Sequence, residues 1–303
     1  MTKIKDIYCF GTSYTAGGGF EFHKDSKLVS LYKKLGIELI QNNFSWPGLL
    51  QPLISDKIKV HNLAKSGYGN ERIYRKTLDV IESKYGNVDD SLFIFEFSGL
   101  GRKEYFFNEI DDYVICNYNF DETETANALM HGIANGYFED TPEMKRLLND
   151  NEELFKKFME KTINFKNQHI IYERNLLMFL SFLESNNINY LINGNVFLNP
   201  KIGKNLPDFS NKLLLFPNDT DKLGDFVQYF NSHDLSLHTE TRGVIKDGHC
   251  GYVGNKIISE MIYNKLIDFG YLDFNKIELT DHTIDLIFKP NRFDENTNFL
   301  ELI

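Results

Sequence analysis

One serine lies where the chain is expected to turn sharply out of an apolar segment. Ser13 is in the loop Gly11–Gly19, and the apolar run Ile4–Phe10 before it predicts a buried strand. Glycines suit such a loop because a tight turn needs positive φ and because a substrate must approach the main chain closely. The pattern makes Ser13 a candidate nucleophile, and a simple surface turn is the alternative that this loop alone leaves open.

A histidine and an aspartate near the other end of the chain could activate such a serine. A serine hydroxyl is a weak nucleophile unless a base accepts its proton, and a carboxylate that holds the base improves it. His249 is the natural base, and Asp247 could orient it because Gly248 lets both side chains turn to one side. Taken alone, the pair also fits an ordinary Asp-Gly turn before a helix.

Three short blocks of the sequence resemble the SGNH (GDSL-type) hydrolases. The family's first block, Gly-Asp-Ser-x-x-x-Gly, is matched by Gly11–Gly17, with Thr12 in place of the Asp. The second, an Asn followed by a Gly after the second strand, is matched within Val60–Gly67. The last, an Asp and a His shortly before the final helix, is approximated within Asp247–Gly254. The blocks occur in the family's order but cover only a small part of the chain.

The resemblance implies a catalytic triad of Ser13, His249 and Asp247. It also implies an oxyanion hole made by the backbone N–H groups of Ser13 and Gly67. We expect neither a cofactor nor a metal. Many family members space the acid and the histidine one residue wider, where this chain has Lys246. Asp247 is then the only acid close enough to serve.

The family's third block, Gly-x-Asn-Asp after the third strand, is not matched. The corresponding stretch, Phe97–Arg102, contains no Asn. Loss of one oxyanion donor typically costs on the order of 10²- to 10³-fold in rate. Ser98, Arg102 or a side chain from the segment that follows could replace it, or the site has lost its activity.

The wider pattern alternates strands and helices. Apolar runs predict strands, and apolar residues at helical spacing predict helices, with Asn70 as an N-cap. The predicted strands are Ile4–Phe10, Lys59–Leu63, Leu92–Phe97 and Asn189–Ile192, and the predicted helices include Trp46–Leu50, Glu71–Ile81, Ile170–Glu184 and Tyr252–Ile267. This alternation predicts an α/β protein with a mainly parallel sheet, whose ligand crevice lies at the carboxyl ends of the strands. With the resemblance, the expected fold is a flavodoxin-like, three-layer α/β/α arrangement.

The same pattern predicts one domain with additions. The SGNH hydrolase-like domain is expected over 1–271, with insertions near 102–166 and 195–240 and a C-terminal extension over 272–303. Within the insertions, Tyr113–Tyr118 and Lys212–Phe216 have the composition of strands.

Composition limits the partners and the compartment. The 303 residues include 33 basic and 43 acidic ones, a formal net charge of −10, and no basic run stands out. We therefore expect neither nucleic acid nor an anionic membrane as a partner. The 3 cysteines are too few for a disulfide framework, and no apolar stretch has the length of a signal peptide or a membrane span. These features predict a cytoplasmic protein, and they indicate no particular oligomeric state.

Two functions follow as hypotheses. The first is an esterase or deacetylase that hydrolyses an O-acyl ester of a small molecule or a glycan, by the Ser-His-Asp mechanism implied by the resemblance. The second is a non-catalytic SGNH-like component of a larger assembly that binds a glycan or a protein, which the missing Asn and Asp favour. A phosphate-binding loop is excluded because Gly-Lys-Ser/Thr and Gly-x-Gly-x-x-Gly are both absent.

Overall fold

The computed structural model describes a central sheet with its helices and parts of the segments attached to them. The described residues are 4–17, 45–98, 102–107, 112–120, 126–129, 157, 165–193, 210–214, 216–217, 223–224 and 252–279. Asp247 and His249 lie outside the described residues, as does most of the second insertion.

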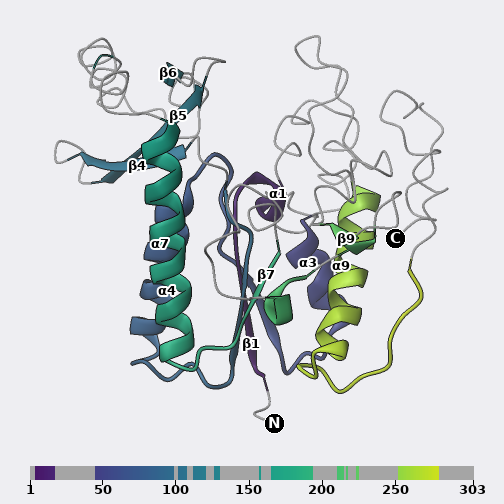
Figure 1. Cartoon of the computed structure of the whole chain (residues 1–303). Coiled ribbons are helices and arrows are strands. Elements are labelled where there is room, and N and C mark those ends of the chain that lie inside the picture. Colours follow the sequence, from purple (N-terminus) through teal and green to yellow (C-terminus); the bar gives the residue numbers. More distant parts are fainter. Residues whose placement is uncertain are drawn as a thin grey trace, which may run out of the picture.

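A four-stranded, all-parallel sheet forms the centre of the molecule (Figure 1). Its strands are β1 (Asp6–Phe10), β2 (Lys59–Asn62), β3 (Ser91–Phe95) and β7 (Tyr190–Ile192), in the order β2-β1-β3-β7. Phe10 pairs with Phe95, and Phe95 pairs with Ile192. The residues that follow these three strands therefore share one edge of the sheet, and the predicted mixed α/β class is confirmed.

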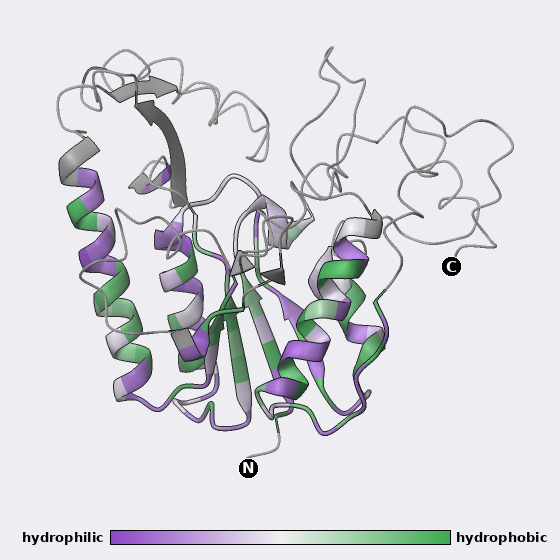
Figure 2. Ribbon diagram, turned by 45° about the vertical axis from the view of Figure 1, so that its right-hand side comes forward, coloured by the Kyte–Doolittle hydropathy of each residue, from purple (hydrophilic) through white to green (hydrophobic). Residues whose placement is uncertain are grey.

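Helices cover both faces of this sheet. On one face, α3 (Trp46–Leu50) and α9 (Tyr252–Asp268) pack over a core that includes Ile7 and Cys9. On the other, α4 (Asn70–Ser83) and α7 (Phe165–Ser185) pack over Tyr8 and Phe10. Side chains along a strand alternate between its faces, so each strand contributes to both cores. Figure 2 shows the largely apolar strands between helices that carry both hydrophilic and hydrophobic residues.

The α4/α7 face of the sheet is largely aromatic. The ring of Phe10 lies 5.2 Å from that of Phe95 and 5.9 Å from that of Phe93, centroid to centroid. Phe179 of α7 meets Phe95 edge to face at 5.3 Å. Rings of this size bury large apolar areas, which makes this face a main source of hydrophobic stabilisation.

The helix predictions that fall on described residues hold, with one correction at an end. The predicted helices at 46–50, 71–81, 170–184 and 252–267 correspond to α3, α4, α7 and α9. However, the N-cap of α4 is Gly69, without a side-chain cap bond, and Asn70 is the first helical residue. The predicted N-cap role of Asn70 is wrong because its side chain bonds to Ser98 instead.

The first insertion contains an antiparallel sheet. It consists of β4 (Arg102–Phe107), β5 (Asp112–Phe120) and β6 (Ala126–Leu129) in that order. β5 includes the predicted strand Tyr113–Tyr118. The side chain of Glu104 in β4 is 1% exposed and accepts a hydrogen bond from Arg75 of α4 at 3.0 Å, which ties the insertion to the core. Burial raises the pKa of Glu104, and the Arg75 guanidinium opposes that rise.

The predicted strand Lys212–Phe216 is corrected. Ser210–Lys212 form a 3-10 helix, η5, and among the described residues that follow, Leu213 makes an isolated parallel bridge with Ile192. A short antiparallel pair follows, β8 (Phe216–Pro217) with β9 (Leu223–Gly224). Leu214 supports this bridge, because its N–H donates to Ile192 O at 2.8 Å.

The chain after α9 packs against that helix. Leu272 is buried in the α3/α9 core, and Asn264 exchanges two hydrogen bonds with the backbone of Ile277, at 2.9 and 3.0 Å. The start of the expected C-terminal extension is therefore fastened to the core. Within the described part of the chain, none of the helices combines the length and the apolar character needed to span a bilayer.

An ion-pair network holds the amino ends of the strands. Lys84 donates to Asp6 Oδ2 at 2.7 Å, and His61 Nε2 lies 2.8 Å from Asp6 Oδ1. Partial burial raises the pKa of the Asp6 carboxyl, but hydrogen bonds with Lys84 and His61 outweigh it and leave the pKa below its ordinary value of 3.8. The network thus stabilises the fold when Asp6 is ionised.

Asp6→Asn should lower the free energy of unfolding by about 1 kcal/mol near neutral pH. Because the folded-state pKa is depressed, this contribution is present above the unfolded-state pKa and is lost as the pH falls through the folded-state pKa. Urea unfolding curves across this range measure the difference, with Asp79→Asn, which breaks an exposed pair with Lys76, as the control. A difference between wild type and Asp6→Asn that does not shrink in acid would contradict the network.

Candidate active site

Ser13 lies at the carboxyl edge of the parallel sheet. β1 ends at Phe10, Thr12 is the N-cap, and Ser13 opens the one-turn helix α1 (Ser13–Ala16). Gly17 then ends α1 in the left-handed region, at φ 77°, and donates its N–H to Ser13 O. Ser13 is 6% exposed. As the first residue of a helix, it has an N–H group with no intrahelical acceptor. The predicted sharp turn therefore consists of two residues, Gly11 and Thr12, between the strand β1 and the short helix α1.

A buried carboxylate from the neighbouring strand holds this turn. Glu96, directly after β3, is 4% exposed. Its Oε1 accepts from Thr12 Oγ1 at 2.5 Å, and its Oε2 accepts from the N–H of Thr12 at 3.2 Å. Oε2 also accepts from the N–H and the hydroxyl of Thr15, at 2.9 and 2.5 Å. Burial raises the pKa of Glu96, and these hydrogen bonds only partly oppose that rise. Four donors thus offset the cost of burying this carboxyl group.

The close approach of Glu96 explains the first glycine of the loop. A Cβ on Gly11 would lie 2.5 Å from Glu96 Oε2 and 2.6 Å from Thr15 Oγ1. Both distances are far below van der Waals contact. A side chain at this position would displace the carboxylate from α1.

The turn after β2 is tied to the same loop. Asn62 donates to Thr15 O and to Ser45 Oγ, each at 3.0 Å, and accepts from Ala64 N–H at 3.1 Å. Lys65 N–H donates to Gly11 O at 3.2 Å. Gly67 follows with φ 85°, a conformation that favours glycine. The Asn and the Gly of the second block are thus brought beside the Ser13 turn, where Asn62 serves as a brace.

Positive charge gathers at this turn. The ring of Tyr68 has Lys65 Nζ at 4.9 Å and the guanidinium carbon of Arg72 at 5.0 Å from its centroid. Arg72 also donates to Leu63 O at 2.6 Å, and burial lowers the pKa of its guanidinium. The cations flank the residue next to Gly67, which favours negative charge on a bound molecule.

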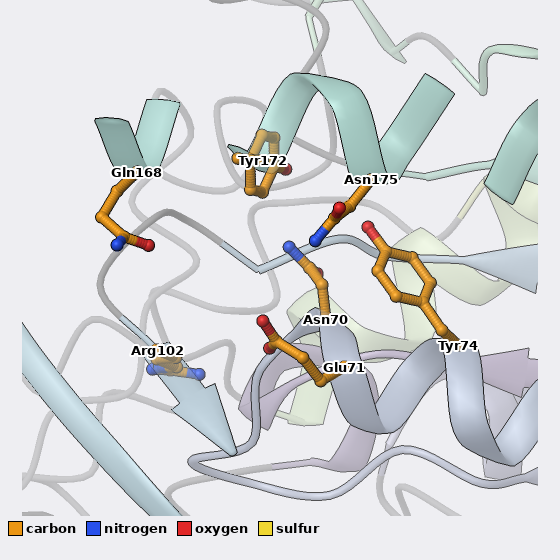
Figure 3. Close-up of a pocket in the computed structure, with 7 residues that line it drawn as sticks. All are labelled: Asn70, Glu71, Tyr74, Arg102, Gln168, Tyr172 and Asn175. Carbon is orange, nitrogen blue, oxygen red and sulfur yellow. The ribbon is translucent and has the colours of Figure 1, made fainter. Parts of the chain in front are cut away.

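The backbone of Ser98 is already engaged in hydrogen bonds. Its N–H donates to Asn70 Oδ1 at 2.7 Å, and its carbonyl oxygen accepts from Asn70 Nδ2 at 3.1 Å and from Tyr172 at 3.2 Å. Arg102, the other candidate for the missing donor, lines a small polar pocket with residues of α4 and α7 (Figure 3). That pocket lies over the α4/α7 face, whereas Glu96 holds α1 from the opposite face. Any donation from Ser98 would have to come from its hydroxyl.

Asn193, directly after β7, is a further buried polar residue at this edge. Its N–H donates to Phe95 O at 2.7 Å, whereas both atoms of its fully buried amide lack a hydrogen-bond partner among the described residues. An unpaired buried polar group costs about 1 to 3 kcal/mol. Such a group in a native structure calls for an explanation, and a place in a functional site is one of them.

The remaining predicted site residues, Asp247 and His249, lie outside the described part of the chain. The described chain resumes at Tyr252 with α9, whose Asn255 accepts from Trp46 N–H at 3.0 Å. Trp46 in turn donates its ring N–H to Thr15 Oγ1 at 3.3 Å. The first turns of α9 are thus connected to the Ser13 helix through one residue of α3. Over the described ranges, no three His, Cys, Asp or Glu side chains gather as metal ligands would.

Sequence reasoning missed Glu96. A signal was present, because an acidic residue interrupts the otherwise apolar run Leu92–Phe97. A carboxyl group in a buried strand needs donors, and the Thr residues of the Gly11–Gly19 loop are suitable ones.

Comparison of the chain with family models and with curated proteins gives no match. Any functional conclusion must therefore come from the residues themselves.

Asn70→Ala should lower the free energy of unfolding by about 2 kcal/mol, because it removes two buried hydrogen bonds and leaves the Ser98 N–H without its acceptor. Chemical denaturation measures the change. Asn186→Ala, which removes an exposed bond to Phe182 O, is the matched control and should cost much less. Equal losses for the two variants would show that the clamp on Ser98 is energetically unimportant.

Proposed function

We propose that this protein is a serine hydrolase of the SGNH type that cleaves O-acyl esters. The observation that carries the proposal is Ser13 itself, at the start of α1 on the carboxyl edge of a parallel sheet, in a turn held by Glu96. The first N–H groups of a helix have no intrahelical acceptor, so they can stabilise an oxyanion that forms beside the hydroxyl. In this proposal His249 is the base and Asp247 orients it.

The strand order supports the position of the site. From β1 the chain passes to β2 on one side and then returns to β3 on the other. Ligands of open α/β sheets bind at the point where the strand order reverses, outside the carboxyl ends of the strands. Ser13 and Glu96 follow the two strands at that point. The order also supports the flavodoxin-like, three-layer SGNH fold as part of the proposal.

The proposed reaction has two steps. Ser13 Oγ attacks the ester carbonyl carbon while His249 takes its proton, and the N–H groups of Ser13 and Gly67 stabilise the oxyanion. Collapse of this intermediate breaks the bond to the alcohol, which leaves with the proton from His249. Water, activated by His249, then attacks the acyl-enzyme and releases the acid together with free Ser13.

The link between α9 and α1 supports the proposed role of His249. His249 precedes α9 closely in sequence, and Asn255 of α9 is connected through Trp46 to Thr15, two residues after Ser13. The substrates to test first are acetylated carbohydrates and small acyl esters, as the resemblance implies. Lys65 and Arg72 add the expectation that an anionic substituent near the ester is tolerated.

A second candidate function is binding without catalysis, to a glycan or to a protein in a larger assembly. One observation favours it: the stretch after β3 offers no Asn, and the backbone of Ser98 is engaged by Asn70 and Tyr172. The oxyanion hole would then lack its third donor. Loss of that donor slows catalysis by orders of magnitude without abolishing ligand binding.

Ser13→Ala should remove nearly all hydrolysis of a p-nitrophenyl acyl ester and all labelling by a fluorophosphonate, because members of a catalytic triad act as a unit. Peptide mapping of the labelled wild-type protein should identify Ser13. Ser83→Ala, at the far end of α4, is the control and should behave as wild type. Hydrolysis that survives Ser13→Ala unchanged would refute the hydrolase and leave the binding function in its place.

Gly67→Ala should lower the turnover number on the order of 10²-fold, because the strained turn moves an oxyanion N–H group. Gly86→Ala is a matched control: its φ is 76°, a Cβ there meets nothing within 4 Å, and it lies at the opposite end of α4. Each change should cost about 1 to 2 kcal/mol of stability, as left-handed alanine does. Equal turnover numbers for the two folded variants would remove Gly67 from the oxyanion hole.

A further inference from the structure

Glu96 has no part in the reaction as proposed, although it has the most extensive contacts with the Ser13 turn. Its carboxylate receives two backbone N–H groups and two hydroxyls from Thr12 and Thr15. We propose that Glu96 is the positioning residue for the nucleophile: by binding both sides of Ser13, it sets the direction of the Ser13 hydroxyl and N–H. This inference rests on the proposed hydrolase function.

The geometry of α1 makes such a residue necessary. An isolated helix of a single turn is unstable in water because nucleation fixes several residues for one hydrogen bond. The N-cap side chain usually stabilises the first turn by accepting from an N–H of that turn. Thr12 makes no such bond, and Glu96 of a different strand accepts from the Thr15 N–H instead. The cap of α1 is thus supplied by the sheet.

The pattern of donors explains what remains for a substrate. Glu96 uses the N–H groups of Thr12 and Thr15. Between them lie Ser13 and Tyr14, whose N–H groups have no acceptor within α1. The hydroxyl of Ser13 makes no hydrogen bond with another described residue, whereas those of Thr12 and Thr15 are both bound. Glu96 therefore engages the N–H groups and hydroxyls of Thr12 and Thr15, and it leaves the Ser13 hydroxyl between them unbound by the described residues.

A rigid support gives this arrangement its precision. Every residue of β3 is buried, and Glu96 N–H donates to Phe10 O at 2.8 Å, which continues the pairing with β1. Catalytic groups must be held to within about 0.5 Å, and a displacement of about 1 Å can cost on the order of 10²-fold in rate. A carboxylate fixed in the centre of the sheet meets this requirement better than a side chain from a loop.

The test compares Glu96→Ala and Glu96→Gln with Glu104→Ala. Glu104 is also a buried carboxylate, but it bonds to Arg75 and not to the Ser13 turn. Each folded variant is tested in three ways. We measure the rate of fluorophosphonate labelling at Ser13, the kcat and KM for a p-nitrophenyl ester, and the thermal stability. Glu96→Ala should lose on the order of 10²-fold in labelling rate and kcat with little change in KM. Glu104→Ala should lose stability while its labelling rate remains that of wild type.

Glu96→Gln should recover most of the lost rate. The amide oxygen can accept from the two N–H groups, and the amide nitrogen can donate to Thr12 Oγ1, whose hydroxyl rotates to accept. Should Glu96→Ala not fold, the double variant Thr12→Val and Thr15→Val removes both hydroxyl donors while both backbone donors stay. That variant should label about 10-fold more slowly than wild type.

Three outcomes would each overturn the role of Glu96 and leave the hydrolase intact. They are a wild-type labelling rate in folded Glu96→Ala, a wild-type labelling rate in the double valine variant, and a Glu96→Gln variant as slow as Glu96→Ala. The last result would show that the hydrogen bonds made by the side chain of residue 96 do not set the rate of labelling at Ser13. Absence of labelling at Ser13 in the wild-type protein is a separate result, which refutes the proposed function and this inference together.

Discussion

A carboxyl group placed at the end of a buried strand must find hydrogen-bond donors, and in this protein that requirement organises the sheet edge. Glu96 continues β3 in the centre of the sheet, where an unpaired charge would cost many kcal/mol. Its donors are the residues on either side of Ser13. Satisfying the carboxylate therefore sets the conformation of α1, and the close approach requires glycine at position 11.

The two faces of the sheet are stabilised by different interactions. The face under α4 and α7 is filled by stacked aromatic rings, which supply apolar burial and few polar contacts. The other face carries a chain of hydrogen bonds from Asn255 through Trp46 to Thr15, with Asn62 as a second brace. The first face stabilises the fold, whereas the second joins α1, α3, α9 and the turn after β2 into one unit around Ser13. This division lets the site be polar without weakening the main core.

Much of the architecture could be predicted because it depends on local patterns. The apolar runs that became β1, β3 and β7, and the helical spacing of α4, α7 and α9, are properties of neighbouring residues. Their alternation sufficed to predict a parallel sheet and to place Ser13 and Gly67 at its carboxyl edge. The predictions failed where one segment meets another. Asn70 bonds to Ser98 instead of capping α4, and among the described residues of the predicted strand 212–216 only Leu213 pairs with the parallel sheet.

The sequence by itself determined where strands and helices form and that a serine follows the first strand in a glycine-rich turn. Only the tertiary structure decided what holds that serine. Glu96 is more than 80 residues from Thr12 and Thr15, and no local periodicity relates them. Their contact exists because β1 and β3 are neighbours with Phe10 opposite Phe95, which brings the residues after both strands together. Partners of buried polar groups follow from strand order and register, and these are set by the packing of the whole sheet.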